Sequence, residues 1–211
     1  MDMTIAVALI LVVSYLLGCF NGAVMISKRI FHDDVRTHGS GNAGLTNFYR
    51  TYGARYALLV IACDMGKCVI AAAIGGTLFR MLYQDWTLGV LIAGLGCILG
   101  HVFPVFYQFK GGKGILAGGA LTIMLDWRFA VIAWGLFILA VVLTRYISLG
   151  SICAASSVGV VSFFLYDRPV YIILCIVLSA LVVWSHRSNI VRLVKGNENK
   201  FKFHVDPPEK K

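Results

Sequence analysis

The chain has 211 residues, of which 59% are hydrophobic and 14% are charged. Its mean hydropathy of +0.81 excludes an ordinary water-soluble domain and predicts an all-α protein embedded in lipid. The formal charge of +9 would also suit nucleic acid, but the basic residues lie between apolar stretches. Membrane lipid and a phosphorylated substrate are therefore the expected partners, and nucleic acid is not.

Seven apolar stretches predict seven transmembrane helices in a single membrane-embedded domain, residues 1–211. In chain order they lie near residues 4–27, 55–78, 86–106, 113–125, 129–144, 149–166 and 169–185. The first lacks the basic start and small-residue cleavage site of a signal peptide, so we expect a retained helix. The fourth is short for a crossing, which leaves a re-entrant or tilted segment as the alternative.

Basic residues are distributed unevenly over the links between these stretches. One face would carry Lys28, Arg29, Arg36, Arg50, Arg55, Lys110, Lys113, Arg145 and the basic tail from Arg187 onward. The other face would keep Arg80, Arg128 and Arg168. Because cytoplasmic loops are enriched in Lys and Arg, this bias predicts an outside N-terminus and a cytoplasmic C-terminus.

The first polar segment runs from His38 to Arg50 and is rich in glycine. Glycines free the backbone N–H groups to face an anion, and short polar side chains add further donors. The candidate substrate contacts are Ser40, Asn42, Thr46, Asn47 and Arg50, whose guanidinium suits phosphate. The alternative is a plain glycine-rich connector that caps a helix.

The second polar segment runs from Gly100 to Gly114 and ends in Gly111-Gly112-Lys113-Gly114, just before an apolar stretch. Backbone donors at a helix N-terminus together with a Lys form a phosphate cradle, although the spacing is not that of a Walker A motif. The alternative is a glycine-rich turn with a snorkelling Lys. We interpret His101 and Pro104 as a structural helix end.

The third polar segment begins at His186, after the last apolar stretch. His186, Asn189 and Arg192 recur at three-residue steps, so a helix would group them on one side. A solvated juxtamembrane helix is the alternative. All three polar segments fall on the predicted cytoplasmic face.

Two further places carry polar groups that could meet an anion. Asp64 and Lys67 lie three residues apart within the second apolar stretch, where they form either a structural ion pair or a phosphate contact. Arg145, Ser148 and Ser151 stand at the link between the fifth and sixth stretches and add possible anion contacts.

Together these segments resemble the acyl-phosphate-dependent glycerol-3-phosphate acyltransferases of bacterial membranes. The patterns Ser-Gly-Asn-x-Gly-x-Thr-Asn-x-x-Arg, Gly-His-x-Phe-Pro-x-Phe with Phe-x-Gly-Gly-Lys-Gly, and His-Arg-x-Asn-Ile-x-Arg-Leu-x-x-Gly-x-Glu are met by residues 40–50, 100–114 and 186–198. Departures from the family pattern are Leu45, Leu116, Ala117 and Ser188. The resemblance implies seven helices in the bacterial plasma (inner) membrane.

The resemblance also implies a reaction, the first acylation step of phospholipid synthesis. The enzyme would move an acyl chain from acyl phosphate to the 1-hydroxyl of glycerol 3-phosphate, which gives lysophosphatidic acid and phosphate. By this likeness Ser40, Arg50, Lys113, His186 and Asn189 line the site, with Ser151 beside them.

The expected mechanism is direct attack of the hydroxyl on the acyl carbonyl. Arg50 and Lys113 would hold the phosphates, and the amides of Gly111 to Gly114 would stabilise the oxyanion. His186 would act as a general base or orient the substrate, and we favour orientation. No metal or cofactor is required, because cationic side chains and backbone donors can neutralise phosphate.

Two other classes of function compete with this reading. A transporter of a phosphorylated anion would need polar or broken helices at mid-membrane with access from both faces. A lipid-binding scaffold would not need three dense clusters of donors. The sequence sets neither an oligomeric state nor a preferred acyl-chain length.

Overall fold

The computed structural model describes residues 1–201, and within them every regular element is a helix. The helices are α1 (Met3–Gly18), α2 (Gly22–Ile30), α3 (Leu45–Tyr52), α4 (Ala57–Tyr83), α5 (Trp86–Val102), α6 (Ile115–Leu125), α7 (Trp127–Thr144), α8 (Ile147–Leu165), α9 (Pro169–Ser185) and α10 (Arg187–Val194), with short turns η1 (Val35–Thr37) and η2 (Val105–Tyr107). The predicted all-α class is confirmed.

Each of the seven predicted stretches contains a helix, but the first does not form one unbroken helix. The chain leaves the α-helix after Gly18 and starts α2 at Gly22. Asn21 caps the new helix, because its side-chain oxygen accepts from the Val24 N–H at 3.0 Å. At the break the Gly22 N–H donates to Asp64 Oδ1 at 3.1 Å, and Asn21 Nδ2 donates to the Ala43 carbonyl at 2.9 Å, so the break is tied to α4 and to the first polar segment.

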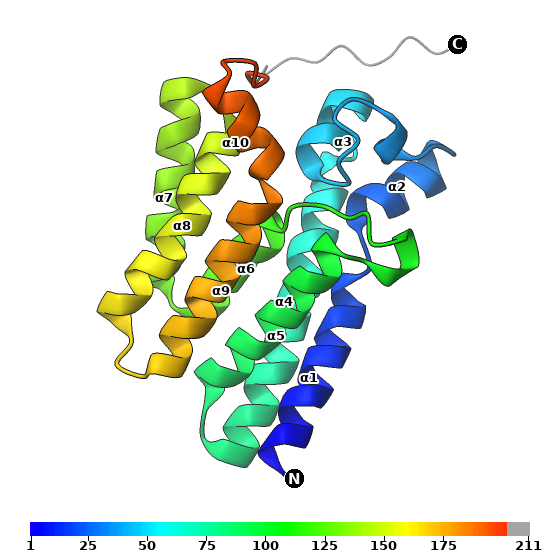
Figure 1. The fold of residues 1–211 in the computed structure, drawn as a ribbon. Coiled ribbons are helices and arrows are strands. Elements are labelled where there is room, and N and C mark those ends of the chain that lie inside the picture. Colours follow the sequence, from blue (N-terminus) through cyan, green and yellow to red (C-terminus); the bar gives the residue numbers. More distant parts are fainter. Residues whose placement is uncertain (202–211) are drawn as a thin grey trace.

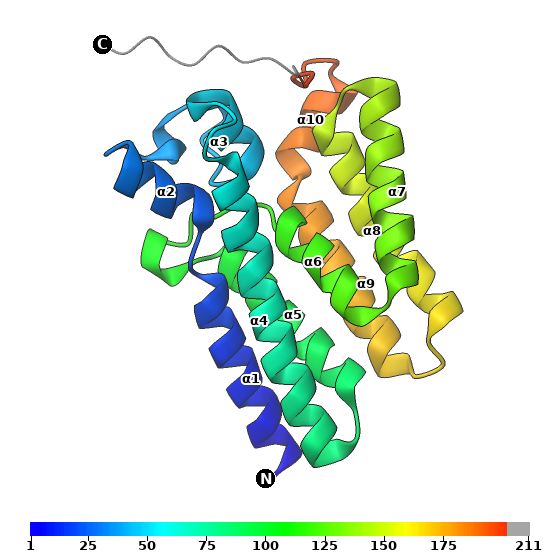
Figure 2. The ribbon, with the colours of Figure 1, turned by 180° about the vertical axis from the view of Figure 1, so that it is seen from behind.

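The long helices form two groups that lie side by side, with a short helix between them. Helices α1, α4 and α5 make one group, and α7, α8 and α9 make the other (Figure 1). Viewed from behind, α6 starts part-way along the bundle and runs toward the end where the N-terminus lies (Figure 2). Helices α2, α3 and α10 gather at the opposite end, which therefore holds the first and third polar segments, while the loop before α6 that carries the second lies part-way along the bundle.

Glycines allow the first group to pack at close range. A Cβ on Gly89 would lie 2.2 Å from the Gly75 carbonyl oxygen, and a Cβ on Gly100 would lie 2.1 Å from that of Tyr15. Small residues at such crossings let helix backbones approach closely, as in other membrane bundles. Helices α1, α4 and α5 thus form a tight scaffold for the site.

Several helices are long and apolar enough to cross a membrane. Among the described residues five candidates qualify: Met3–Ile30, Ala57–Tyr83, Trp86–Tyr107, Trp127–Thr144 and Ile147–Leu165. A sixth arises if α9 and α10, bent by 58°, count as one span, and α6 is apolar but has only 11 residues. On α7 apolar side chains such as Val142 and Leu143 are exposed at 71% and 73%, as lipid-facing positions would be.

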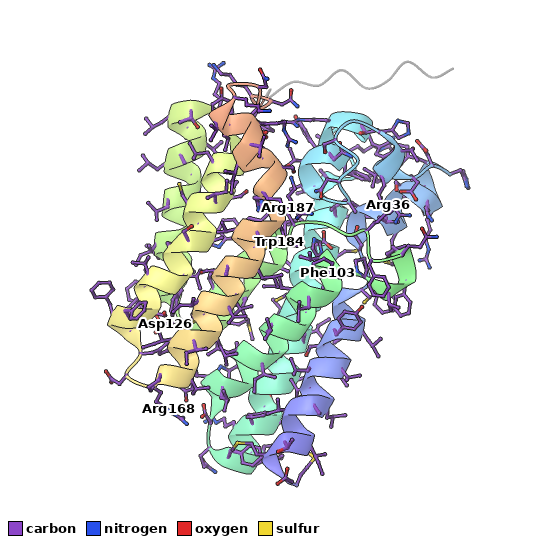
Figure 3. The ribbon with its side chains drawn as sticks, viewed as in Figure 1. Arg36, Phe103, Asp126, Arg168, Trp184 and Arg187 are labelled. Carbon is purple, nitrogen blue, oxygen red and sulfur yellow. The ribbon has the colours of Figure 1, made fainter. Side chains whose placement is uncertain are left out.

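Side-chain contacts join neighbouring elements at two levels of the bundle (Figure 3). At the N-terminal end, Asp126 caps α7 and pairs with Arg128 at 2.9 Å, while Arg168 pairs with Asp85. Part-way along the bundle, Trp184 of α9 packs against Phe103 at the end of α5, with ring centroids 5.7 Å apart. The two helix groups are therefore joined at the level where the pocket begins.

Candidate active site

The first polar segment is a tight loop held together by Asn47. Its side-chain oxygen accepts from the Ser40 N–H at 3.0 Å, and its Nδ2 donates to the carbonyls of Val35 and His38 at 2.9 and 3.0 Å. Gly39 adopts a φ of 54°, which glycine tolerates without strain. Asn47 borders the pocket, but its side-chain amide is already hydrogen-bonded within the loop that presents Ser40.

The second polar segment lies against the end of α5. The Gly112 N–H donates to the His101 carbonyl at 3.0 Å, and a Cβ on Gly112 would lie 2.1 Å from His101 Nε2. Gly114 has a φ of 82° and is the N-cap of α6. This path turns Lys113 into the pocket and brings the N-terminus of α6 to the same place.

The third polar segment bends sharply where α9 ends and α10 begins. His186 stands at this bend, and its Nδ1 lies 2.8 Å from the Val182 carbonyl oxygen. Because a carbonyl only accepts, Nδ1 carries the hydrogen, and Nε2 of the neutral ring is left as an acceptor. Asn189 and Arg192 follow on α10, on the side that His186 faces, as the three-residue spacing predicted.

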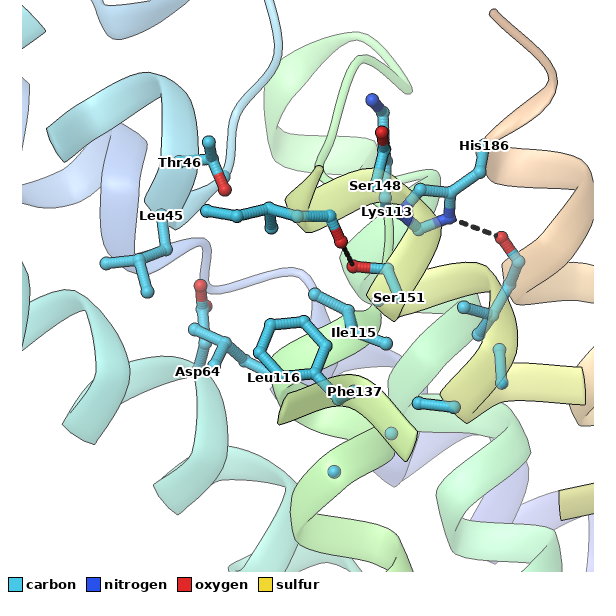
Figure 4. Close-up of a pocket in the computed structure, with 18 of the residues that line it drawn as sticks. Leu45, Thr46, Asp64, Lys113, Ile115, Leu116, Phe137, Ser148, Ser151 and His186 are labelled. Atoms are coloured by element: carbon cyan, nitrogen blue, oxygen red, sulfur yellow. Dashed lines mark hydrogen bonds between the residues drawn. The ribbon is translucent and has the colours of Figure 1, made fainter. Parts of the chain in front are cut away.

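These segments meet in one cavity of about 400 Å³. Lys113 Nζ donates to Asn189 Oδ1, which links the second segment to the third. The polar wall of the cavity contains Ser40, Asn42, Thr46, Asn47, Arg50, Asp64, His101, Lys113, Gly114, Ser148, Ser151, His186, Asn189, Arg192 and Glu198. Lys113, Ser148, Ser151 and His186 lie together in Figure 4, while Ile115, Leu116 and Phe137 form an apolar region beside them.

Four of the predicted site residues do not line this cavity. Lys67 lies behind it, because its Nζ donates to Asp64 Oδ1 at 2.9 Å and to the Phe20 carbonyl at 2.7 Å. Gly111 and Gly112 pack against the end of α5 instead. Arg145 ends α7, and its carbonyl accepts from Phe201 N at 2.7 Å.

Of the two readings of Asp64 and Lys67, the structure favours the ion pair, with His101 as a third member. His101 Nδ1 lies 2.9 Å from Lys67 Nζ, and Asp64 accepts from the Gly22 N–H at 3.1 Å. The cluster therefore ties α4, α5 and the start of α2 together beneath the second segment.

Glu198 is a site residue to which the sequence reasoning gave no role. Its carboxylate accepts from Ser148 at 3.0 Å, from Asn189 at 2.9 Å and from Arg192 at 2.7 Å. The sequence signal that could have identified it is an isolated acidic side chain a few residues after a basic helix. Glu198 thereby fixes two pocket residues of α10 against α8.

Burial and charge act together on the cationic groups. Burial, followed by the positive charge of Arg192, lowers the pKa of Lys113 from 10.5 to about 8. Burial would raise the pKa of Glu198, but hydrogen bonds from Asn189, Arg192 and Ser148 outweigh it and lower that pKa. The pocket thus holds an excess of positive charge in a partly desolvated space, which favours a bound anion.

Metal ligands are not grouped in the described part of the chain. Among residues 1–201 no three His, Cys, Asp or Glu side chains lie close enough to hold an ion. The expectation that the reaction needs no metal or cofactor stays a prediction.

Comparison with known proteins agrees with the resemblance. A family model described as Glycerol-3-phosphate acyltransferase matches residues 8–196. The chain is 37% identical over 194 residues to the glycerol-3-phosphate acyltransferase of Prochlorococcus marinus (strain MIT 9301), which covers 91% of this chain and 96% of the relative. Identity to the enzyme of the same name from Thermoanaerobacter sp. (strain X514) is 36% over 189 residues, covering 90% and 92%.

A solved structure shares the fold over nearly its whole length. The crystal structure of PlsY (YgiH), an integral membrane glycerol 3-phosphate acyltransferase in its glycerol 3-phosphate form, is similar with a TM-score of 0.84 and 32% identity. The alignment covers 93% of this chain and 96% of that one. This chain therefore belongs to the glycerol-3-phosphate acyltransferase family and is an integral, multi-pass membrane enzyme.

Proposed function

We propose that the chain transfers an acyl group from acyl phosphate to the 1-hydroxyl of glycerol 3-phosphate, with lysophosphatidic acid and phosphate as products. One observation carries the proposal: Ser40, Arg50, Lys113, His186 and Asn189 come from three distant segments and line one cavity. The same cavity continues into an apolar region that suits a fatty chain. A site for one anionic and one lipid substrate is what this reaction requires.

Arg50 and Lys113 hold the two phosphates. Both side chains border the cavity, Arg50 from α3 and Lys113 from the loop before α6, so each can meet one phosphate. Ser40 and Asn189 add donors that orient the glycerol. Holding both substrates in line replaces a bimolecular encounter by an oriented one.

The oxyanion is stabilised at the N-terminus of α6. The Gly112 N–H is already bonded to the His101 carbonyl, so it is not free for this role, although it was predicted to take part. The first N–H groups of a helix have no partner within the helix, and Ile115 and Leu116 stand at that position on the cavity wall. These amides, together with Lys113, face charge that develops on the carbonyl oxygen.

The hydroxyl oxygen attacks the acyl carbonyl, the bond from carbon to the phosphate oxygen breaks, and phosphate leaves with the electron pair. His186 Nε2 accepts a hydrogen bond from the glycerol and orients it, since Nδ1 is already committed to Val182. The leaving phosphate takes the proton. No covalent acyl-enzyme forms.

A variant at His186 tests this assignment. Substitution of His186→Ala should raise KM for glycerol 3-phosphate while kcat falls by less than about tenfold, because orientation without proton transfer loses roughly one hydrogen bond. Steady-state kinetics with varied glycerol 3-phosphate measures both constants, with His32→Ala as the control. A loss of about 100-fold or more in kcat at saturating substrate would instead assign a general base.

The site faces the cytoplasm in this proposal, and the chain crosses the membrane seven times. Helices α1, α4, α5, α6, α7, α8 and α9 alternate in direction (Figures 1 and 2). Arg50 on α3 and Arg187 on α10 lie toward one end, and Lys113 precedes the start of α6 in the same half of the bundle, whereas Arg128 and Arg168 lie at the other end. The positive-inside bias then supports an N-terminus outside. The C-terminal residue itself falls beyond the described residues.

One assay separates the enzyme from its rivals. Purified protein in detergent, given acyl phosphate and glycerol 3-phosphate, should form lysophosphatidic acid and release one phosphate for each product molecule. A transporter or a lipid-binding scaffold would release none. Acyl phosphate turnover without dependence on glycerol 3-phosphate would refute the proposed acceptor.

A further inference from the structure

The apolar part of the cavity ends at a similar depth on three helices. On α7, α8 and α9 the lining residues farthest from the polar wall are Ala133, Val158 and Leu178. One turn beyond them, Phe129, Ser162 and Cys175 are buried at 1%, 0% and 0% exposure. Tightly packed side chains therefore lie beyond this level on α7, α8 and α9.

The lining of the cavity extends farthest along α6. Its cavity-facing residues extend from Gly114 to Leu125, at the far end of the helix. Trp134 of α7 lies over this part of the lining, because its Nε1 donates to the Gly119 carbonyl at 3.3 Å. A Cβ on Gly119 would lie only 2.9 Å from Trp134 Cζ2, so the glycine is what admits the indole.

The distance to this level can be compared with an acyl chain. Val158 lies about two turns beyond Ser151, and Leu178 lies about two turns from His186, which is roughly 11 Å at 1.5 Å per residue. An extended chain advances about 1.2 Å per bond, since three backbone bonds span about 3.3–3.6 Å. About nine carbons thus reach the level of Val158 and Leu178, and later carbons must pass Trp134 along α6.

We propose that Trp134 sets the acyl-chain length preference of the enzyme. Its indole lies across the channel that leads from the reaction site to the cavity-facing residues of α6. This inference rests on the proposed function. Chains that end before Trp134 bind without meeting the indole, and longer chains must displace or pass it. Removing the indole should open the part of the channel along α6 to long chains.

Gly118 offers the opposite change on the facing helix. It lines the cavity, and a Cβ there would have its nearest neighbour, Ile98 Cδ1, at 4.0 Å. A leucine side chain would therefore grow into channel space rather than into protein, and leucine favours a helix more than glycine does. Gly118→Leu should block long chains without loss of folding.

The experiment is a competition between two acyl phosphates in the same detergent, one with ten carbons and one with sixteen. Product chain lengths are measured by mass spectrometry, and their ratio gives the ratio of kcat/KM. Each methylene that gains or loses apolar contact changes kcat/KM by a factor of about four. Trp134→Ala should raise the ratio of long to short product at least about fourfold, and Gly118→Leu should lower it at least about fourfold.

Matched controls lie outside the cavity. Trp127 is 70% exposed at the start of α7, and a Cβ on Gly135 would meet nothing within 4 Å. Trp127→Ala and Gly135→Leu should leave the ratio within about twofold of the unmodified protein, as surface substitutions do. Because both donors compete for the same enzyme, the ratio of long to short product does not depend on the fraction of the protein that is active.

An unchanged ratio in Trp134→Ala, or an equal shift in Trp127→Ala, would overturn the inference. If Trp134→Ala fails to fold, Gly118→Leu decides, and a ratio that does not fall would overturn it. If the unmodified protein forms no lysophosphatidic acid from either donor, the proposed function fails, and the inference falls with it.

Discussion

Replacing Lys113 by methionine should make the protein more stable and much less active. The side chains have similar length, so Lys113→Met removes the charge while it keeps most of the packing. The lowered pKa of Lys113, from 10.5 to about 8, means that its charge costs the folded state roughly 3 kcal/mol. Loss of the hydrogen bond to Asn189 offsets about 1 kcal/mol of this gain.

The sign of this effect depends on pH. The folded pKa of Lys113 lies below the unfolded one, so below about pH 8 the amine is charged in both states and the full cost is present. Between about pH 8 and 10.5 the folded amine loses its proton first, and the unmodified protein gains stability. The advantage of Lys113→Met should therefore be largest at neutral pH and should disappear above about pH 10.5.

The loss of activity follows from the missing contact with phosphate. A charge-assisted hydrogen bond contributes about 1.5–3 kcal/mol, so kcat/KM should fall roughly 10- to 150-fold. Phosphate release gives kcat/KM, and thermal unfolding in detergent gives the stability. Lys110→Met, in the same segment but exposed, is the control and should change neither. A Lys113→Met protein that keeps its activity within threefold of this control would refute the assignment.

Two further predictions concern the same loop. Gly112→Ala should abolish most activity, because its Cβ would lie 2.1 Å from His101 Nε2 and 2.8 Å from the Ala43 carbonyl oxygen. The control is Gly66→Ala, whose Cβ would have nothing within 4 Å and which should leave the activity unchanged in the same assay. The kcat/KM of the unmodified protein should fall above about pH 8, as Lys113 loses its charge, and Lys113→Arg should move that fall to higher pH. A pH–rate profile that is identical in the two proteins would show that another group is responsible.

The helices could be predicted from the sequence because apolar stretches separated by charges have few alternatives in lipid. The break between α1 and α2 was missed, since Asn21 sits in a run of hydropathy high enough to read as one helix. What reveals the break is the cap that Asn21 makes with Val24 and its Nδ2 bond to the Ala43 carbonyl at 2.9 Å. The second of these partners lies far along the chain, where local hydropathy gives no signal.

Site residues could be predicted where the type of side chain alone indicates binding of phosphate. Arg50, Lys113 and His186 were identified this way, and they meet in the cavity. Lys67 was also proposed as a substrate contact, but the spacing from Asp64 does not show which side of α4 faces the cavity. Its position behind the pocket depends on the Phe20 carbonyl and on His101, which other elements supply.

The role of Glu198 could not be deduced for a related reason. Its three partners come from α8 and α10, and the turn after α10 that brings them together has no local signature. Trp134 likewise becomes significant because Gly119 of the preceding helix admits it. Both roles depend on contacts between elements rather than on composition.

A structure of this protein with glycerol 3-phosphate bound tests the central claim most directly. The phosphate should lie within hydrogen-bonding distance of Arg50 or Lys113, with the glycerol 1-hydroxyl beside His186 Nε2 and the free apolar channel beyond it. A phosphate bound outside this cavity, or with Arg50, Lys113 and Asn189 all turned away from it, would contradict the claim that the three segments form one site.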